Sequence, residues 1–198
     1  YNLYEEYMAI KKLTTKTSTS QRLKDERYQK LDTFQIISMV PLHPYQNIAD
    51  IGTGNGLLSI ALAKYLFDGT VYVLDTRKTF LQNVESKVKE IGVSNVETQS
   101  YSSGGKLPLD NDILDGAFAA CLLNRTRNQS KMISEIYRLI KPGGWLSIIE
   151  WQENSIDGPP ADQRINETMM KNLLADSSFR LVSKHNLSSC QYMIIVRK

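Results

Sequence analysis

The sequence predicts an α/β domain in which a doubly wound, mostly parallel sheet is covered by helices on both faces. Three observations lead to this prediction. The short apolar segment Ile48–Ile51 precedes a glycine-rich turn and a helix-forming segment that begins at Leu57. Apolar strand segments and helical segments then alternate as far as Trp151, which is typical of parallel sheets. Finally, two strand segments near the end of the chain are separated by a short connection, which requires an antiparallel hairpin.

The composition limits the protein to a single domain of moderate size. The chain has 198 residues, of which 41% are hydrophobic, enough for one well-buried core. The sequence contains no apolar run of about 18 residues and no secretory signal pattern, so we expect a cytoplasmic protein without a membrane span. Cys121 and Cys190 are isolated from each other, which predicts reduced thiols and no metal site.

The excess positive charge lies at the N-terminus. The first 30 residues contain seven Lys or Arg and four Asp or Glu, while the remaining residues are balanced. A basic segment could bind nucleic acid or an acidic substrate, but no aromatic side chains interleave with the charges as in single-strand binding. We therefore interpret this segment as the solvated face of a helix, and nucleic acid stays an alternative partner.

The first 44 residues are interpreted as a helical appendage or lid that precedes a domain of residues 45–198. Apolar side chains recur at helical spacing, and two prolines end the pattern. The predicted helices of this appendage span Tyr1–Leu13, residues 21 to 30 and Leu31–Val40.

The elements of the domain follow from apolar periodicity and from glycine and proline signals. Gly92 is the expected C-cap of the second helix, and the K-P-G-G segment Lys141–Gly144 is expected to end the third. The predicted strands are Ile48–Ile51, Val71–Asp75, Asn95–Gln99, Ile113–Leu123, Trp145–Trp151, Phe179–His185 and Gln191–Lys198. The predicted helices are the segment from Leu57 to Ala63, Thr79–Ile91, Gln129–Ile140 and Asp162–Ala175.

The glycine turn after the first strand is the main functional signal. Gly52, Gly54 and Gly56 occupy alternate positions, which allows a sharp turn and lets a ligand approach the main chain. Free amides at the start of the following helix favour polar or anionic ligand groups. The turn indicates a nucleotide-type cofactor site, and a glycine turn without a ligand is the alternative.

A carboxylate at the end of the second strand strengthens this reading. Asp75 lies 19 residues beyond Gly56 and closes the strand V-Y-V-L-D. In doubly wound sheets the end of that strand reaches the same crevice as the glycine turn, where an aspartate can accept hydrogen bonds from both ribose hydroxyls. The alternative is an exposed carboxylate at a strand end.

Taken together, these residues resemble the class I S-adenosylmethionine-dependent methyltransferases, especially the type 11 group similar to the ubiquinone and menaquinone biosynthesis methyltransferases. The resemblance covers about residues 45 to 198 and implies a seven-stranded Rossmann-like sheet. It depends on D-I-G-T-G-N-G at Asp50–Gly56, Asp75, L-P-L at Leu107–Leu109 before D-I-L-D-G-A-F, and L-I-K-P-G-G at Leu139–Gly144.

The resemblance implies a set of cofactor-binding residues. Asp50 would hold the methionine amino group, the backbone of Gly52, Thr53, Gly54 and Gly56 would line the methionine and ribose, and Asp75 would bind the ribose hydroxyls. Thr76 would lie against the adenine, and Ser102 and Ser103 stand where relatives commonly have an aspartate that accepts a bond from the adenine amino group. Ala120 and Cys121 would pass close to the methionine, with Cys121 a packed neighbour and not a nucleophile.

A nicotinamide-binding fold is the main competing reading of the glycine turn. The dinucleotide fingerprint requires a further glycine at position 57, where this chain has Leu57. The observed spacing follows the methyltransferase pattern, which has an acidic residue before the glycines. S-adenosylmethionine is therefore the expected cofactor.

The favoured function is methyl transfer to a small-molecule acceptor by in-line displacement. The sequence identifies no general base, since His43 and His185 are isolated. The acceptor pocket is expected near Asn124–Asn128, Trp151–Arg164 and the N-terminal helices, with Trp151, Tyr4 and Tyr7 as a candidate aromatic wall. Two alternatives stay open: a methyltransferase for RNA or protein, and a non-catalytic homologue that binds the cofactor or has lost it.

Overall fold

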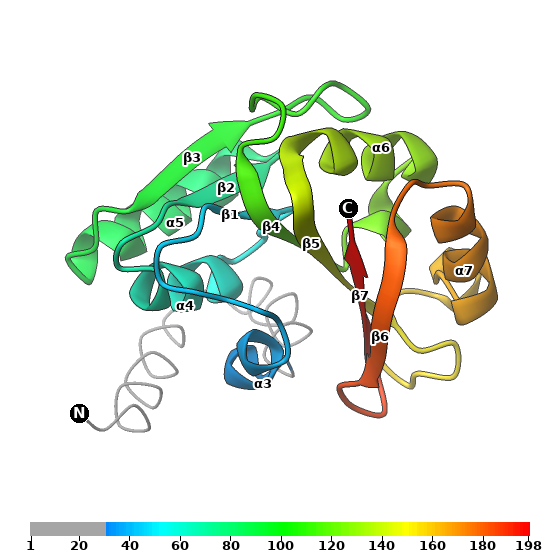
Figure 1. Cartoon of the computed structure of the whole chain (residues 1–198). Coiled ribbons are helices and arrows are strands. Elements are labelled where there is room, and N and C mark those ends of the chain that lie inside the picture. The colour runs from blue at the N-terminus through cyan, green and yellow to red at the C-terminus, as the bar shows by residue number, and fades with distance from the viewer. Residues whose placement is uncertain (1–30) are drawn as a thin grey trace. The chain divides into compact units, whose positions relative to one another are not determined.

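The computed structural model describes residues 31–198 (Figure 1), and of these Asp32–Lys198 form one compact unit. The predicted helices over Tyr1–Leu13 and residues 21 to 30, as well as Tyr4 and Tyr7, lie outside the described residues.

A single sheet of seven strands organises the described part of the chain, in the order β3-β2-β1-β4-β5-β7-β6. The first five strands in chain order are parallel, while β7 runs antiparallel between β5 and β6. The predicted fold class is thus confirmed, including the closing hairpin. The strands are β1 (Ile48–Ile51), β2 (Val71–Asp75), β3 (Val96–Ser100), β4 (Leu114–Ala120), β5 (Ile140–Trp151), β6 (Arg180–Asn186) and β7 (Gln191–Arg197).

Helices cover both faces of the sheet, as the buried strands require. One face packs against α6 and α7, whose apolar side chains share a core with alternate residues of β1, β4, β5 and β7. The other side of the sheet carries α3, α4 and α5. The helices are α3 (Thr33–Ser38), α4 (Leu57–Tyr65), α5 (Lys78–Glu90), α6 (Gln129–Leu139) and α7 (Glu167–Ala175), with short 3₁₀ turns η1 (Leu123–Arg125) and η2 (Ala161–Gln163).

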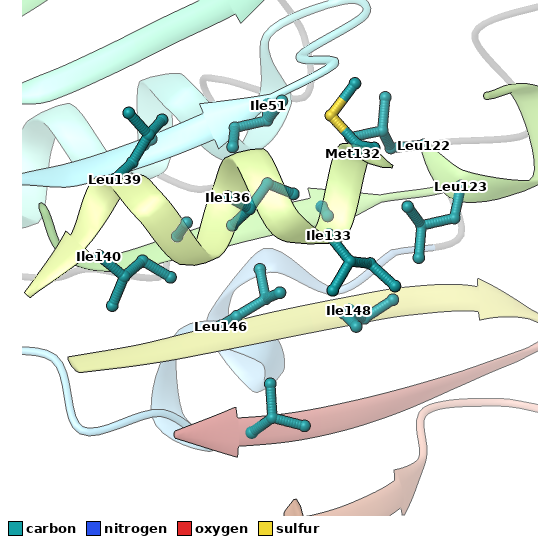
Figure 2. Close-up of a cluster of buried hydrophobic side chains, with 14 of the residues drawn as sticks. Ile51, Leu122, Leu123, Met132, Ile133, Ile136, Leu139, Ile140, Leu146 and Ile148 are labelled. Atoms are coloured by element: carbon teal, nitrogen blue, oxygen red, sulfur yellow. The ribbon is translucent and has the colours of Figure 1, made fainter. Parts of the chain in front are cut away.

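Helix α6 shows how sequence spacing becomes packing. Its buried residues Met132, Ile133, Ile136 and Leu139 recur every three or four positions and form one apolar stripe. Figure 2 shows this stripe directed at the side chains of β1 and β5, such as Ile148. The core on this face extends to Leu122 and Leu123, the two residues that lead from the end of β4 into η1.

Helix α6 ends just before Lys141–Gly144, as predicted, but strand β5 begins at Ile140, so the prediction that the strand starts at Trp145 is wrong. Ile140 pairs with Leu114, and the register then shifts before Trp145 pairs with Gly116. Gly143 accommodates this register shift because it adopts a φ of +81°, a backbone angle that glycine tolerates. The strand can start early because Gly143 and Gly144 exchange backbone hydrogen bonds with Lys198 at the end of the chain.

Three other predicted boundaries also differ, each because a side chain or a backbone angle fixes the end. Helix α3 starts at Thr33 because Asp32 has extended backbone angles and caps it through the N–H groups of Phe34 and Gln35, so the apolar helix does not run from Leu31 to Val40. Strand β4 ends at Ala120, since Cys121 has a φ of +48°. Helix α7 begins at Glu167, where Asn166 accepts a hydrogen bond from the Met169 N–H.

Within the described residues, no helix has the length and apolar character needed to cross a membrane.

Candidate cofactor site

The candidate site lies at the carboxyl ends of the central strands. Strand β1 has β2 on one side and β4 on the other, and the chain winds in opposite directions on its two sides. Such a point of reversal leaves a crevice beyond the strand ends, and ligands of open α/β sheets bind there. The glycine turn, Asp75 and the residues that follow β4 all belong to this edge.

The glycine turn adopts the conformation that its sequence predicts. Gly52, Gly54 and Gly56 have φ values of +79°, +58° and +78°, in the left-handed region that other residues rarely adopt. Space is also restricted, because a Cβ at Gly52 would lie 2.9 Å from Leu122 Cδ1. The Gly56 N–H donates to the Thr53 carbonyl oxygen at 3.1 Å, which closes the turn at the start of α4.

We expect the substitution Gly56→Ala to lower the free energy of unfolding by about 2 kcal/mol. A Cβ at this position would meet Val84 Cγ2 of α5 at 2.4 Å, in addition to the strain of a positive φ. Gly92 is the matched control, because its φ is +72° and no atom of the described part of the chain lies within 4 Å of the added Cβ. Urea denaturation should therefore give a loss of only about 1 kcal/mol for Gly92→Ala, and equal losses would contradict the packing argument.

Asp75 links the glycine turn to the end of β2. Its carboxylate is 4% exposed, and Oδ2 accepts the Gly54 N–H at 3.2 Å. The other oxygen, Oδ1, accepts the Arg77 N–H at 2.9 Å. Each carboxylate oxygen can accept more than one hydrogen bond, so both keep capacity for a further donor. The spacing in sequence correctly predicted that Asp75 and the glycine turn would meet.

Asp50 is a buried carboxylate below the turn, at 2% exposure. The Ser59 hydroxyl of α4 donates to its Oδ2 at 2.5 Å, and Ser59 Oγ lies 2.7 Å from Thr53 Oγ1. Burial raises the pKa of Asp50 to about 6, while the hydrogen bond from Ser59 opposes this rise and the nearby Asp75 charge adds to it. A carboxylate in these surroundings favours a cationic partner. Ser59 was not among the predicted site residues.

The predicted adenine-side residues lie on exposed turns. Thr76 follows Asp75 directly and is exposed, and Ser102 and Ser103 are exposed in the turn after β3. Tyr101, which was not predicted, connects the two turns because its N–H donates to the Asp75 carbonyl oxygen at 3.3 Å. The Tyr101 side chain is 9% exposed, and burial, with a smaller effect of Asp75, raises its pKa to about 12.

The end of β4 brings Ala120 and Cys121 to the same edge, both of them buried. The Cys121 N–H donates to the Ile149 carbonyl oxygen at 2.7 Å, although the residue has a positive φ. Burial, together with the Glu150 charge, strongly raises the pKa of the Cys121 thiol. A thiol that stays protonated is a poor nucleophile, so packing is the role that its surroundings support.

Glu150 is a third residue at the edge of the site that was not predicted, besides Ser59 and Tyr101. It lies near the end of β5 at 0% exposure, and its Oε1 accepts the N–H groups of Leu123 and Asn124 at 2.9 and 3.2 Å. These bonds fix the segment that follows β4. The signal was visible in the sequence, since S-I-I-E-W contains one acidic residue in an otherwise apolar strand, like Asp75 in V-Y-V-L-D.

The loop between β5 and α7 is held by Arg164. Its guanidinium donates to the backbone carbonyl oxygens of five loop residues between Gln152 and Pro159, at 2.7 to 3.4 Å. Ile156 is 92% exposed on this loop, whereas Trp151 is buried against Gly158. Trp151 therefore packs inside the described part of the protein, and Tyr4 and Tyr7, the other members of the predicted aromatic wall, lie outside the described residues.

A polar cavity of about 460 Å³ lies beside the same loop, between its first residues, the start of α7 and the β6–β7 turn. Among residues 31–198, the residues that line it include no aliphatic side chain. The lining residues are Gln152, Glu153, Asn154, Asn166, Glu167, Thr168, Ser189 and Tyr192.

Known proteins that resemble the chain share this architecture. The protein family described as a methyltransferase domain matches residues 42–193. A SAM-dependent methyltransferase from Aquifex aeolicus has a similar structure, with a TM-score of 0.82 and 24% sequence identity, over 91% of this chain and 98% of that one.

Two curated relatives match about half of the chain. The biotin biosynthesis bifunctional protein BioHC of Teredinibacter turnerae is 26% identical over 108 residues, which are 52% of this chain and 19% of that protein. The ubiquinone/menaquinone biosynthesis C-methyltransferase UbiE of Vibrio campbellii is 24% identical over 115 residues, 58% of this chain and 44% of that protein. The matched segment thus spans less than half the length of either relative.

Proposed function

The chain belongs to the methyltransferase domain family, and from this premise we propose that it transfers a methyl group from S-adenosylmethionine to a small-molecule acceptor. One observation carries the proposal: the buried Asp75 carboxylate accepts the Gly54 N–H, so an acidic strand end and a glycine turn share one crevice. This pairing is what recognition of a ribose beside close backbone contacts requires.

The residues at the strand ends fit the proposed cofactor. The turn at Gly52, Gly54 and Gly56 lacks side chains where a ligand would approach the backbone, and its positive φ values maintain that shape. Asp50 offers a buried carboxylate for the methionine ammonium group, and Asp75 offers acceptors for the ribose hydroxyls. Thr76, Ser102 and Ser103 would flank the adenine, while Ala120 and Cys121 would pack beside the methionine portion.

The protein's part in the reaction is to bind, orient and exclude water. When bound, the sulfonium of S-adenosylmethionine supplies an activated methyl group. Asp50 and Asp75 would fix the two ends of the donor, and the segment from Leu122 to Asn124 would fix its side wall. Alignment of an acceptor in line with the methyl group provides most of the rate in such a reaction. A separate base is needed only for acceptors that must lose a proton.

The acceptor is proposed to be a small molecule on three grounds. UbiE is named as a C-methyltransferase of ubiquinone/menaquinone biosynthesis, and quinones are small cyclic compounds. The β5–α7 loop, fixed by Arg164, presents the exposed Ile156 beyond the strand ends. Residues 31–198 carry equal numbers of basic and acidic side chains, whereas RNA binding is favoured by an excess of positive charge. RNA retention at low salt would favour the alternative acceptor.

Calorimetry with S-adenosylmethionine tests the donor. We expect saturable binding with a dissociation constant in the micromolar range, because the charged contacts at Asp50 and Asp75 would each contribute about 1 to 3 kcal/mol. Absence of heat at millimolar ligand would defeat the enzyme proposal and leave a non-catalytic homologue. Incubation of the protein with metabolite extracts and methyl-labelled donor would then identify the acceptor.

A further inference from the structure

Glu150 is a buried acid that the proposed reaction does not use directly. One carboxylate oxygen, Oε1, accepts two backbone N–H groups, from Leu123 and Asn124. The other, Oε2, is fully buried and has no hydrogen-bond partner among residues 31–198. An ionised oxygen left without a donor in the protein interior is strongly unfavourable. The ionised form of Glu150 is therefore unfavourable in these surroundings unless a further group stabilises Oε2.

Two other side-chain oxygens at this end of the sheet are in the same condition as Oε2. Asn124 Oδ1 and Gln191 Oε1 are also buried without partners in the described part of the chain. Asn124 is bonded to Glu150 through its own N–H, whereas Gln191 pairs with Trp151, so its side chain lies on the other face of the sheet from Glu150. A proton on Oε2 would remove the cost of an unpaired negative charge at this buried atom and make it a hydrogen-bond donor.

The groups that face Glu150 do not neutralise it by a direct ion pair. Arg125 of η1 attracts its charge, but the Arg125 Nε donates to the Cys121 carbonyl oxygen at 2.8 Å. Cys121 and Tyr192 both interact with Glu150, and their own pKa values are strongly raised, so they stay neutral. Glu167 of α7 also raises the pKa of Tyr192. The pKa of Glu150 itself is raised by burial to about 7, against the opposing effects of the Asn124, Leu123 and Trp151 N–H groups and of the Arg125 charge.

Glu150 is also close to the glycine turn. The Leu122 side chain lies against Gly52, since a Cβ there would be 2.9 Å from Leu122 Cδ1. The next two residues, Leu123 and Asn124, are the ones whose N–H groups bind Glu150, and Figure 2 shows Leu122 and Leu123 at the end of the shared core. One short segment thus separates the turn from the buried acid.

We propose that Glu150 is a specificity-determining residue that is protonated in the free protein and ionises when a positively charged cofactor binds at the glycine turn. This inference depends on the proposed cofactor. S-adenosylmethionine carries a sulfonium charge, whereas its product S-adenosylhomocysteine carries a neutral thioether. A positive charge nearby stabilises the carboxylate and releases its proton, and a neutral sulfur does not. The ionised Glu150 would then favour the methyl donor over the product.

Two measurements test this proposal. In the first, infrared difference spectra of the cofactor-free protein compare wild type with Glu150→Gln across about pH 5 to pH 8. We expect a carboxylic-acid carbonyl band that belongs to Glu150 and disappears near pH 7. Ionisation of Glu150 throughout this range would overturn the proposal, whether or not any cofactor binds.

In the second, calorimetry at pH 7 in buffers of different ionisation enthalpy counts the protons released on binding. S-adenosylmethionine should release about half a proton more than S-adenosylhomocysteine, because Glu150 is about half protonated at this pH. Protons from Asp50 are released by both ligands, since both carry the ammonium group, and so cancel in the difference. Glu150→Gln should abolish the difference, and Glu90→Gln, at the exposed end of α5, should preserve it.

The outcomes of the calorimetry separate the two proposals. Equal proton release by both ligands, or a difference that persists in Glu150→Gln, overturns the role of Glu150 while the cofactor proposal stands. Failure of both ligands to bind overturns the proposed function, and the infrared measurement still decides the protonation of Glu150.

Discussion

The variant Glu150→Gln is expected to be more stable than the wild type above pH 7, by up to about 3 kcal/mol. Burial raises the pKa of Glu150 from its ordinary value of 4.5 to about 7 in the folded protein. The folded state therefore holds this proton more tightly than the unfolded state. Its stabilising effect is complete below about pH 4.5 and is lost as the pH rises through about 7. The glutamine variant buries no charge at this position, so it does not lose stability in this way as the pH rises.

Urea denaturation at about pH 5 and pH 8 provides the measurement. The side-chain amide oxygen introduced by Glu150→Gln would still accept the Leu123 and Asn124 N–H groups, so the variant should fold, and its stability relative to wild type should increase with pH. Glu90→Gln, at the exposed end of α5, should change stability equally at both values. A relative stability of Glu150→Gln that is constant or falls between the two pH values would contradict the assignment. Asp50 also contributes to the pH dependence of both proteins and cancels in the comparison.

The second large effect concerns cofactor affinity. Asp75→Ala should weaken S-adenosylmethionine binding by up to about 3 kcal/mol, which is roughly a hundredfold, because charge-assisted hydrogen bonds to the ribose are lost. Calorimetric titration of the variant measures the change. An unchanged affinity would show that the ribose does not lie at the end of β2.

Asp75 also holds the glycine turn through the Gly54 N–H, so a loss of affinity alone does not identify a ribose contact. A thermodynamic cycle that combines the Asp75→Ala variant with a modified ligand separates the effect on the glycine turn from the effect on the ribose contact. In the wild type, an analogue of S-adenosylhomocysteine that lacks one ribose hydroxyl should bind less tightly than the parent compound. In Asp75→Ala, parent and analogue should bind equally. If the analogue loses the same factor in both proteins, Asp75 acts only by shaping the turn.

The Asp75 and Glu150 variants test different parts of the proposed reaction. Asp75 concerns how the donor is held, and Glu150 concerns how its charge is distinguished from that of the product. Both residues end or nearly end a buried strand, and both bind backbone N–H groups of a neighbouring segment. A carboxylate in this position can support a loop and interact with a ligand at the same time. The paired tests are designed to separate these two contributions.

Local sequence was sufficient where local chemistry decides the structure. Gly52 and Gly56 need positive φ values whatever surrounds them, and the apolar segment before them is too short for anything but a buried strand. The approach of Asp75 to Gly54 also followed from sequence, because parallel strands joined by a helix bring their carboxyl ends to one edge. The hairpin of β6 and β7 followed from the short connection between them.

Contacts between distant segments decided the rest. The early start of β5 depends on bonds between Gly143 and Lys198, 55 positions apart, and the loop after β5 depends on one arginine that binds five carbonyl oxygens. Glu150 reads in sequence as an acidic residue in an apolar strand, and only the fold places it beneath Leu123 and Asn124. The sequence by itself determined the fold class, the glycine turn and its acidic partner, since these depend on backbone preferences and strand order. The burial of Glu150, its two backbone hydrogen bonds and the bonds that shape the loop join segments far apart in the sequence, so the tertiary structure alone decided them.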